Sequence, residues 1–552
     1  MGAASMGTAG ESGSRGVTEE VAGRALAAVR RFAEQVLRCG LDVYGPKQTP
    51  LLVDGLNVET HEPVTWRRNG ETWILSNLGN QQLLFRTLDG LTALTGDPRY
   101  RAAADEALRY AFRHLRSENG LLYWGGHVAY DAGGDRIVEE RHSHELKCHY
   151  PYYQLMWQVD PAATKRLLEA IWAGHILDWS TLDMNRHGRY DAPVARPWDH
   201  DYAGGEVFFT GRGLTFCNTG SDLIYAAGVL HHLTGEPGPL IWARRLAHRY
   251  VETRNPRTGL GGYQYSRIAN DRALAQFGPE FGERALEGTV LDLGHARTRY
   301  AVMGIAELKL GALLGTAGRE FIQWAAEDLA AYARHAYDPA TNTFRAMLSD
   351  GTPLSPADLK RDGYYRRAEL FTPQAPDATY LWAYALAFRL TCDPLHWEMA
   401  RRIAQGHGLG DIGDLGTSRD GGGAEGERDL RLETRCAEPH ALLALLELYR
   451  ATMDGRLLAA AGAVAGNILA ARFQDGFFLP RPDHLYARFD AIEALALLRF
   501  AAVAEGRPED VPDAWPAEPY FQAPHDGIGR ARDTEVIYGR TRRDAGQVSP
   551  RG

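Results

Sequence analysis

Residues 219–254, TGSDLIYAAGVLHHLTGEPGPLIWARRLAHRYVETR, contain the pattern that decides the fold. Apolar residues recur at spacings of three and four on both sides of Thr234-Gly235-Glu236-Pro237, which is typical of two amphipathic helices. A connection this short places consecutive helices side by side and antiparallel. The stretch therefore predicts a helical hairpin.

The same unit recurs along the chain, and we find about fourteen helical segments with this periodicity. At Asp97-Pro98, Asp160-Pro161 and Asp393-Pro394 an aspartate precedes a proline, which suits the N-cap and the first helical position. The predicted segments are 17–39, 77–95, 98–116, 145–159, 161–178, 219–234, 238–254, 294–314, 318–336, 376–391, 394–405, 434–452, 456–472 and 486–504.

The connectors between these segments alternate between short and long. Tight turns follow the even-numbered helices up to the twelfth, for example at Thr95-Gly96, Val159-Asp160 and Asp454-Gly455. In an up-and-down array, alternate connectors lie at the same end, so the long connectors are expected to gather on one rim. The long connectors are 40–76, 117–144, 179–218, 255–293, 337–375 and 406–433.

This arrangement predicts an all-α toroid, an (α/α)₇ barrel over residues 17–504 with its long loops on one face. A straight α-solenoid is the alternative, although its repeats should be more uniform in length and sequence. Residues 1–16 are expected to form a disordered tail, and residues 505–552, rich in Pro and charge, a peripheral C-terminal extension. Segment 406–430 contains three consecutive glycines and is expected to be a mobile loop.

Composition excludes some classes of partner. A net charge of −9 and a pI near 6.1 argue against nucleic-acid or membrane binding, although a basic cleft could still bind a polyanion. No stretch reaches the roughly 18 apolar residues of a membrane span. The 5 scattered cysteines suggest a reduced compartment, and residues 1–16 contain no apolar signal segment. A cytoplasmic location is therefore expected, and the oligomeric state stays open.

Three short motifs on the predicted loop rim carry groups that bind metals. His127 ends the run Tyr123–His127, Glu145 lies at the start of the next predicted helix, and His187 follows Arg186 in connector 179–218. Two imidazoles and one carboxylate are a common ligand set for a divalent transition metal. Ca²⁺ and Mg²⁺ prefer oxygen ligands, so they fit this set less well.

Other histidines keep the choice of ligands open at this point. The chain has 19 histidines, and His142, His144, His149 and His175 lie near the same motifs. On the predicted helix, Glu145 and His149 would sit one turn apart and could form a different ligand pair.

These motifs resemble polysaccharide lyase family two, the pectate disaccharide-lyases. The resemblance runs in order from about residue 49 to about residue 375, and little is matched beyond. The runs that carry it are Thr49–Gly55, Ser76-Asn77, Tyr123–His127, His144–Lys147, Pro151–Tyr153, His175–Trp179, Leu182-Asp183, Arg186–Gly188, Gly213–Phe216, Asp222–Ala227, Arg254–Gly259, Gln276–Gly282 and Arg361–Tyr365.

The resemblance implies an (α/α)₇ barrel and a divalent metal held by His127, Glu145 and His187, with Arg186 as the Brønsted base. It favours Mn²⁺, with Co²⁺ or Ni²⁺ as alternatives. It also implies cleavage of polygalacturonate or oligogalacturonates by β-elimination to 4,5-unsaturated products, with release of disaccharides from a chain end. Arginine is an unusual base, because its ordinary pKa exceeds about 12, so Arg186 could instead clamp a substrate carboxylate.

A polygalacturonate chain also needs cations for its carboxylates and flat rings for its sugars. We expect Arg272 and Arg212 to provide the cations, with Arg272 the preferred clamp because it precedes the matched run Gln276–Gly282. Tyr263, Tyr364 and Trp124 are the candidate sugar-binding rings, although a tryptophan in such a run is more often part of a core.

Two other functions remain open from the sequence. An inverting glycoside hydrolase on the same toroid would need two carboxylates about 6.5–9.5 Å apart, for which Asp183 and Asp222 are candidates. That reading leaves the His/Glu set and Arg186 without a purpose. A non-catalytic protein that binds acidic sugars is the other alternative, and the intact set of four residues argues against it.

Overall fold

The hairpin predicted from residues 219–254 is present as α6 (Cys217–Thr234) and α7 (Pro237–Glu252). Gly235 ends α6 in the left-handed conformation, with φ of 73°, which glycine adopts without strain. The computed structural model describes residues 7–68, 70–139, 143–205, 212–265, 267–361, 363, 365, 368–415, 429–525, 529–532 and 537–545. Tyr364, one of the candidate sugar-binding residues, and residues 416–428 of the expected mobile loop lie outside these ranges.

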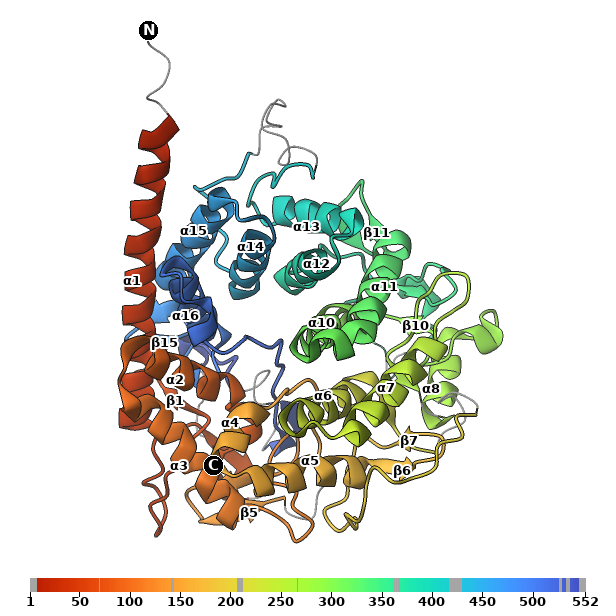
Figure 1. Ribbon diagram of the computed structural model, residues 1–552. Coiled ribbons are helices and arrows are strands. Elements are labelled where there is room, and N and C mark those ends of the chain that lie inside the picture. The colour runs from red at the N-terminus through yellow and green to blue at the C-terminus, as the bar shows by residue number, and fades with distance from the viewer. Residues whose placement is uncertain are drawn as a thin grey trace.

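Over the described residues the helices form a closed ring of seven inner and outer pairs, which Figure 1 shows end-on. Inner helices such as α12 are buried from Ala378 to Phe388, whereas outer helices such as α3 bury one stripe. The inner helices are α2 (Gln82–Thr95), α4 (Tyr153–Val159), α6, α10 (Met303–Leu314), α12 (Ala378–Thr391), α14 (Pro439–Thr452) and α16 (Ile492–Ala504). Their outer partners are α3 (Pro98–His114), α5 (Pro161–His175), α7, α11 (Arg319–Ala336), α13 (Pro394–Gly406), α15 (Gly455–Arg472) and α1 (Gly7–Cys39).

The predicted toroid is therefore confirmed, and its closure is specific. The first helix, α1, packs outside the last inner helix, α16, and α16 also contacts α2 and α14 on either side. Within the described residues, three helices lie outside the repeating pairs: α8 (Arg267–Phe277), α9 (Leu293–Ala296) and α18 (Arg542–Ala545). A π-helical stretch, Arg297–Val302, joins α9 to α10.

Several predicted helix boundaries are wrong, and two of them bear on the site and on the N-terminus. The helix expected from residue 145 begins at Tyr153, because His144 and Glu145 pair with other backbone segments instead of starting a helical turn. Glu145 and His149 are consequently not neighbours on a helix face. At the N-terminus, α1 begins at Gly7, so residues 7–16 belong to a helix rather than to the expected disordered tail.

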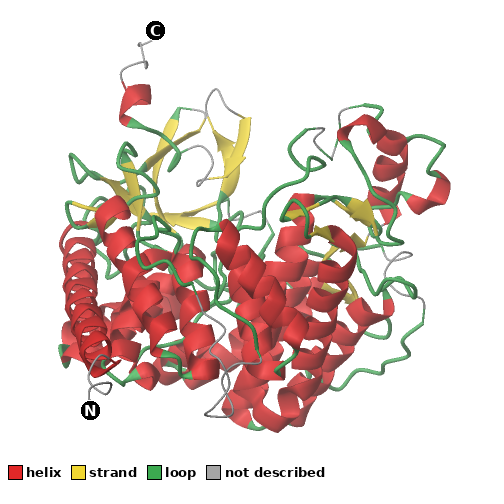
Figure 2. Cartoon of the chain, turned by 90° about the horizontal axis from the view of Figure 1, so that it is seen from above, coloured by secondary structure: helices red, strands yellow, loops and turns green. Residues whose placement is uncertain are grey.

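Short strands, which the all-α prediction did not include, occupy the long connectors on one side of the helical layer (Figure 2). One antiparallel sheet has the order β2-β3-β4-β5, with Trp66 opposite Trp73 and Ser76 opposite Tyr130, and the other strands form pairs. The strands are β1 (Gly55–Asn57), β2 (Thr65–Arg68), β3 (Glu71–Ser76), β4 (Ala129–Asp131), β5 (Arg136–Val138), β6 (Ile176–Asp178), β7 (Asp183–Met184), β8 (Thr215–Phe216), β9 (Gln264–Tyr265), β10 (Val290–Leu291), β11 (Tyr337–Asp338), β12 (Thr343–Phe344), β13 (Met347–Leu348), β14 (Phe473–Gln474), β15 (Phe477–Phe478), β16 (Tyr486–Arg488), β17 (Gln522–His525) and β18 (Gly529–Arg532).

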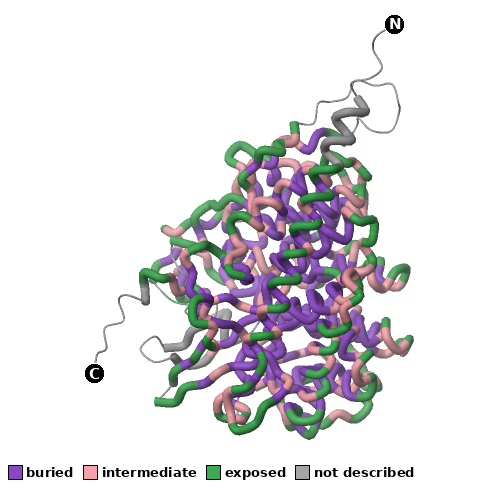
Figure 3. The backbone as a smooth tube through the Cα atoms, turned by 90° about the vertical axis from the view of Figure 1, so that its left-hand side faces the viewer, coloured by how far each residue is buried: buried purple, intermediate pink, exposed green. Residues whose placement is uncertain are grey.

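Buried residues are concentrated inside the helical body, and exposed residues follow its outside (Figure 3). Within the described ranges one helical run, Leu293–Ala336, is long and apolar enough to cross a membrane. However, 67% of its most apolar window is buried inside the protein, as expected for a helix of the barrel core.

The C-terminal extension is not peripheral over residues 511–522. Trp515 is 4% exposed, and Tyr520 and Phe521 are also buried. In Figure 1 this part of the chain crosses the middle of the ring from the end of α16 toward α6. The proline and charge content of this segment predicted a peripheral position, which is wrong for residues 511–522. These residues are buried because the helical ring surrounds them, not because they carry a periodic apolar face.

Candidate metal and catalytic site

His127, Glu145 and His187 converge on the face of the ring that carries the long connectors. Nε2 of His127 lies 2.8 Å from Oε2 of Glu145, and Nε2 of His187 lies 3.6 Å from Oε1 of Glu145. One ligand atom from each residue lies within 4.8 Å of the others. A single ion could bridge atoms at this spacing, and the donor set is one that transition metals favour.

The backbone brings these three residues together through direct pairing. Glu145 forms a parallel bridge with Gly125, whose neighbour Gly126 donates its N–H to the Glu145 carbonyl at 2.9 Å. His144 exchanges two backbone hydrogen bonds with Gly188, the residue after His187. Gly125 has φ of 97°, and a Cβ there would lie 2.3 Å from the Glu145 carbonyl oxygen, so the close approach requires glycine.

A chain of buried rings holds the same segments from behind. The Trp124 indole N–H donates to Nε2 of His144 at 3.0 Å, which leaves the proton of His144 on Nδ1, 2.9 Å from Nε2 of His175. Nδ1 of His175 then donates to the Asn185 carbonyl at 2.7 Å. These bonds connect the residue before Glu145 with the residue before Arg186.

The hydrogen bonds also show which of the nearby histidines have structural partners. His144 and His175 are used in the buried chain, and His149 lies apart from the three converging residues with its Nδ1 near backbone atoms of Lys147. Trp124 is 1% exposed, so the expectation that it contacts substrate is wrong in this structure. It belongs to the core and positions the site instead. His142 lies outside the described residues.

Glu145 is an anion completely buried among cations. Its Oε1 lies 2.9 Å from Nζ of Lys147 and 3.4 Å from Nε of Arg186, in addition to the two histidines. Burial raises the pKa of Glu145, but the neighbouring Lys147, His127 and Arg186 lower it more, so the pKa lies well below its ordinary value. Burial lowers the pKa of His187 to about 4, which keeps its imidazole neutral, the form that binds metals.

Arg186 borders this cluster without being one of the three ligand candidates. Its backbone N–H donates to the Leu214 carbonyl at 3.0 Å, and its guanidinium carbon lies 4.6 Å from the centre of the Phe216 ring. One quarter of the side chain is exposed. The guanidinium group therefore contacts both a buried carboxylate and an aromatic ring, and part of the side chain faces the solvent.

Comparison with known proteins gives a clear answer. The sequence model of a family described as periplasmic pectate lyase matches residues 49–524. The pectate disaccharide-lyase of Dickeya dadantii (strain 3937) is 31% identical over 550 residues, which cover 93% of this chain and 96% of that protein. The chain belongs to the periplasmic pectate lyase family. It is thus an enzyme, a polysaccharide lyase that cleaves pectate, and the match extends well beyond residue 375, where the recognisable motifs end.

Solved structures with a similar course of the chain are more distant. A D-mannose isomerase shares 13% identity, with a TM-score of 0.41, over 70% of this chain and 86% of that one. The α-1,2-mannosidase from Trichoderma reesei shares 10% identity, with a TM-score of 0.47, over 88% of this chain and 93% of that one.

The family corrects one expectation. A cytoplasmic location is wrong, because the family is described as periplasmic. The expectation rested on the lack of an apolar signal segment and on the cysteine pattern. All five cysteines are free in the structure, but free thiols do not determine a compartment.

The residues expected to bind substrate differ in how well they are placed. Arg272 is exposed on α8, and Arg212 is exposed close to Leu214, which pairs with Arg186. Tyr263 is only 7% exposed, and one face of its ring stacks on His295 at 4.3 Å. A sugar therefore has little access to Tyr263, whereas the His295 side chain is 26% exposed.

The carboxylates considered for a hydrolase have other partners in this pectate lyase. Asp183 accepts the backbone N–H groups of Arg212 and Gly213 at 2.9 and 3.2 Å. Asp222 is buried and accepts the N–H groups of His149 and Tyr150. Both hold backbone segments of the site in place, so no observation favours an inverting hydrolase.

Several residues of the site were not predicted from the sequence. Lys147 and Phe216 lie in the runs His144–Lys147 and Gly213–Phe216, which carry the resemblance, and these runs were the available signal. Tyr520 donates a short hydrogen bond to Oε2 of Glu145, and Gln522 contacts His127. No signal in the sequence indicated these two, because they lie hundreds of residues from their partners.

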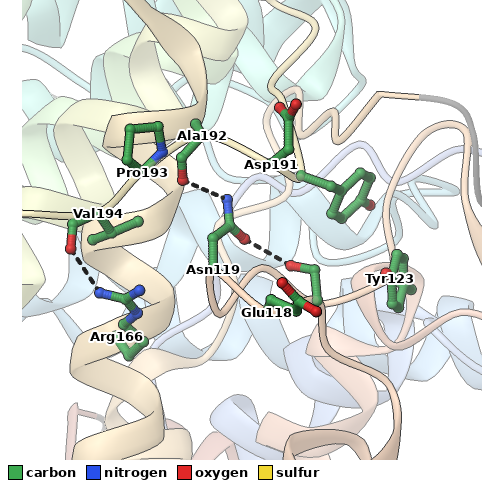
Figure 4. Close-up of a pocket in the computed structure, with 10 residues that line it drawn as sticks. Glu118, Asn119, Tyr123, Arg166, Asp191, Ala192, Pro193 and Val194 are labelled. Atoms are coloured by element: carbon green, nitrogen blue, oxygen red, sulfur yellow. Dashed lines mark hydrogen bonds between the residues drawn. The ribbon is translucent and has the colours of Figure 1, made fainter.

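The connectors that carry the site are also tied together on the outside of the barrel. A surface pocket lies between residues 117–123 and 190–194, and Figure 4 shows the side chains that line it. The Asn119 amide donates to the Ala192 carbonyl at 3.1 Å, and Arg166 donates to the Val194 carbonyl at 2.9 Å. The Asn119 bond joins the connector of His127 to the connector of His187, and the Arg166 bond fastens the latter to α5.

Replacing Glu287 by glutamine is expected to stabilise the protein above neutral pH. Both carboxylate oxygens of Glu287 are buried without a hydrogen-bond partner, and burial raises its pKa to about 7, although His295, Arg272 and Arg186 act in the opposite sense. A raised pKa means that the folded protein favours the protonated acid. The free energy of unfolding therefore falls as the pH rises from 4.5, the ordinary pKa of glutamate, through about 7, the pKa of Glu287 in the folded protein. The loss amounts to about 3 kcal/mol at most.

Thermal unfolding of wild type and Glu287→Gln should coincide near pH 4, and the variant should melt higher at about pH 8. Glu283→Gln, at an exposed position four residues before Glu287, is the control and should show no such divergence. Equal melting curves for Glu287→Gln and wild type at both pH values would contradict the prediction.

Proposed function

We propose that this pectate lyase releases unsaturated disaccharides from the end of polygalacturonate or oligogalacturonate chains by metal-assisted β-elimination. The observation that carries the proposal is the convergence of His127, Glu145 and His187 beside Arg186. The relative from Dickeya dadantii is named a pectate disaccharide-lyase, which supports the exo mode of release.

The residues present fit a divalent transition ion, and we propose Mn²⁺, with Co²⁺ or Ni²⁺ as alternatives. His127, Glu145 and His187 would hold it, since they offer two imidazoles and one carboxylate on a site whose backbone is fixed by direct pairing. When bound, the ion would withdraw charge from the substrate carboxylate, which would make C5–H more acidic.

Arg186 is the proposed base. Arg186 accepts the proton from C5, the C5–H electrons form the C4–C5 double bond, and the bond from C4 to the glycosidic oxygen breaks. The leaving oxygen takes up one proton from solvent and Arg186 later releases one to solvent, so the elimination consumes no water. Phe216 and Glu145 both contact the guanidinium group, which limits its motion and prepares it for the transfer.

Substrate binding is proposed for the exposed residues around this cluster. Arg272 and Arg212 have charged, accessible side chains that can pair with uronate carboxylates. Tyr364 stays a candidate for stacking on a sugar ring. Tyr263 stacks on His295 and is proposed to support that histidine rather than to contact the sugar directly.

The assay that tests the proposal follows the ultraviolet absorbance of the 4,5-unsaturated uronate. We expect absorbance to rise when the purified protein is mixed with polygalacturonate and Mn²⁺, and to stop rising when a chelator is added. Mass spectrometry of the early products should show the unsaturated disaccharide. New reducing ends without absorbance would indicate hydrolysis instead, and binding without either signal would indicate a non-catalytic protein.

A further inference from the structure

Residues 511–522, called the crossing segment here, pass through the ring from one face to the other. The segment starts on the face of the tight turns, where Arg507 donates to the carbonyls of Ala93 and Leu94 at the end of α2. It finishes on the opposite face, where the Gln522 N–H donates to the Gly126 carbonyl at 2.8 Å. The end of the crossing segment thus lies beside the residues that bring the metal ligands together.

Charged and aromatic contacts fix the middle of the crossing segment. Asp513 lies 3.3 Å from Nζ of Lys309 on α10 and 3.1 Å from Nη2 of Arg499 on α16. The Trp515 ring packs against Tyr225 of α6, with ring centres 4.5 Å apart. Glu518 pairs with Arg297, and its N–H donates to the Cys148 carbonyl at 2.8 Å. The segment is therefore anchored to helices on several sides of the ring.

Two residues at the end of the crossing segment contact two of the three candidate ligands. The Tyr520 hydroxyl donates to Oε2 of Glu145, the oxygen that also faces His127. Nδ1 of His127 lies 3.2 Å from the Gln522 carbonyl, and because a carbonyl only accepts, the ring donates from Nδ1. This bond leaves Nε2 of His127 directed at Glu145, as metal ligation by this histidine requires.

The fold makes room for this approach. A Cβ on Gly126 would lie 2.5 Å from the Tyr520 oxygen, so glycine at this position lets the phenol reach Glu145. The Tyr520 ring in turn lies 5.0 Å from Nζ of Lys147, the other partner of Glu145. Tyr520 is 3% exposed, and its hydroxyl is therefore shielded from competition by water.

We infer that Tyr520 is a positioning residue of the metal centre, and that metal affinity depends on the crossing segment being seated in the ring. The inference rests on the proposed function, since it assigns the ligands as above. Partners that orient metal ligands typically change affinity by about 10- to 100-fold when removed. By linkage, an ion bound to Glu145 and His127 must also hold the crossing segment more firmly in place.

The test measures binding of Co²⁺ alone, by calorimetry and by the visible absorption of the bound ion, to the full-length protein. Tyr520→Phe removes only the hydroxyl and should weaken Co²⁺ binding by about 10- to 100-fold and alter the visible spectrum. Tyr384→Phe is the matched control: it removes a buried hydroxyl on α12 that donates to the Leu329 carbonyl of α11 at 3.0 Å, and the variant should bind Co²⁺ as the wild type does.

Hydrogen exchange gives a second measurement. Co²⁺ should slow the exchange of amides in residues 511–522 of the wild type, and this protection should be smaller in Tyr520→Phe. A Tyr520→Phe protein with wild-type affinity, spectrum and protection would overturn the inference and leave the lyase function intact. A wild type that binds Co²⁺ in this way but forms no unsaturated uronate would instead overturn the proposed function alone.

Discussion

His187→Ala is expected to eliminate the metal-dependent rise in ultraviolet absorbance with polygalacturonate. The variant loses one of two imidazoles in the candidate ligand set, and Glu145 and His127 alone leave the ion with too few protein ligands. We expect the affinity for Mn²⁺ to fall by more than about 100-fold, which exceeds the typical effect of removing a supporting residue. The fold should persist, because His187 is about one-third exposed and fills no core position.

Calorimetric titration with Mn²⁺ and the absorbance assay measure these two effects separately. His335→Ala, which alters an exposed histidine in the last turn of α11, is the control and should match the wild type in both. Normal turnover by His187→Ala would show that the ion, if one is needed, binds elsewhere.

Arg186→Lys is expected to keep the metal and lose the reaction. Lysine retains a positive charge next to Glu145 but places a single, strongly hydrated nitrogen where the planar guanidine lay over Phe216. The turnover number should fall by about 100- to 10,000-fold, the range for loss of a positioned base. Metal affinity should be nearly unchanged, because Arg186 is not among the ligands.

The pH dependence of the residual activity strengthens this test. A lysine that replaces the base should shift the rising limb of the pH profile, whereas loss of a substrate clamp should raise KM and leave the profile unchanged. Arg456→Lys, at an exposed position at the start of α15, serves as the control. Full activity in Arg186→Lys would remove Arg186 from the role of base.

The ring could be predicted from the sequence because each helical pair carries its own local signals. The Asp-Pro starts of α3, α5 and α13 and the left-handed Gly235 after α6 are set by neighbouring residues, and the structure has them as expected. The start of α4 was misplaced for the opposite reason. Glu145 pairs with a segment twenty residues earlier, and this tertiary pairing overrides the local apolar period.

The site shows the same division. His127, Glu145, Arg186 and His187 were chosen on the residues and the resemblance, and the structure brings them together, while their roles stay predictions. The prediction that Trp124 contacts substrate was wrong, because its ring is buried against His144 and neighbouring connectors that lie far from it in the sequence. Tyr520 could not be found, since nothing local to a Pro-rich tail reveals that it runs through the barrel.

The pairing of α1 with α16 affects how the chain is made. A ring closed by its first and last helices stays open on the ribosome until nearly the whole polypeptide has emerged, so the apolar sides of α2 and α14 that face α16 remain uncovered throughout synthesis. We expect nascent chains to depend on chaperones during that interval. Deleting α1 should also be as harmful to solubility as deleting α16, although the two lie at opposite termini.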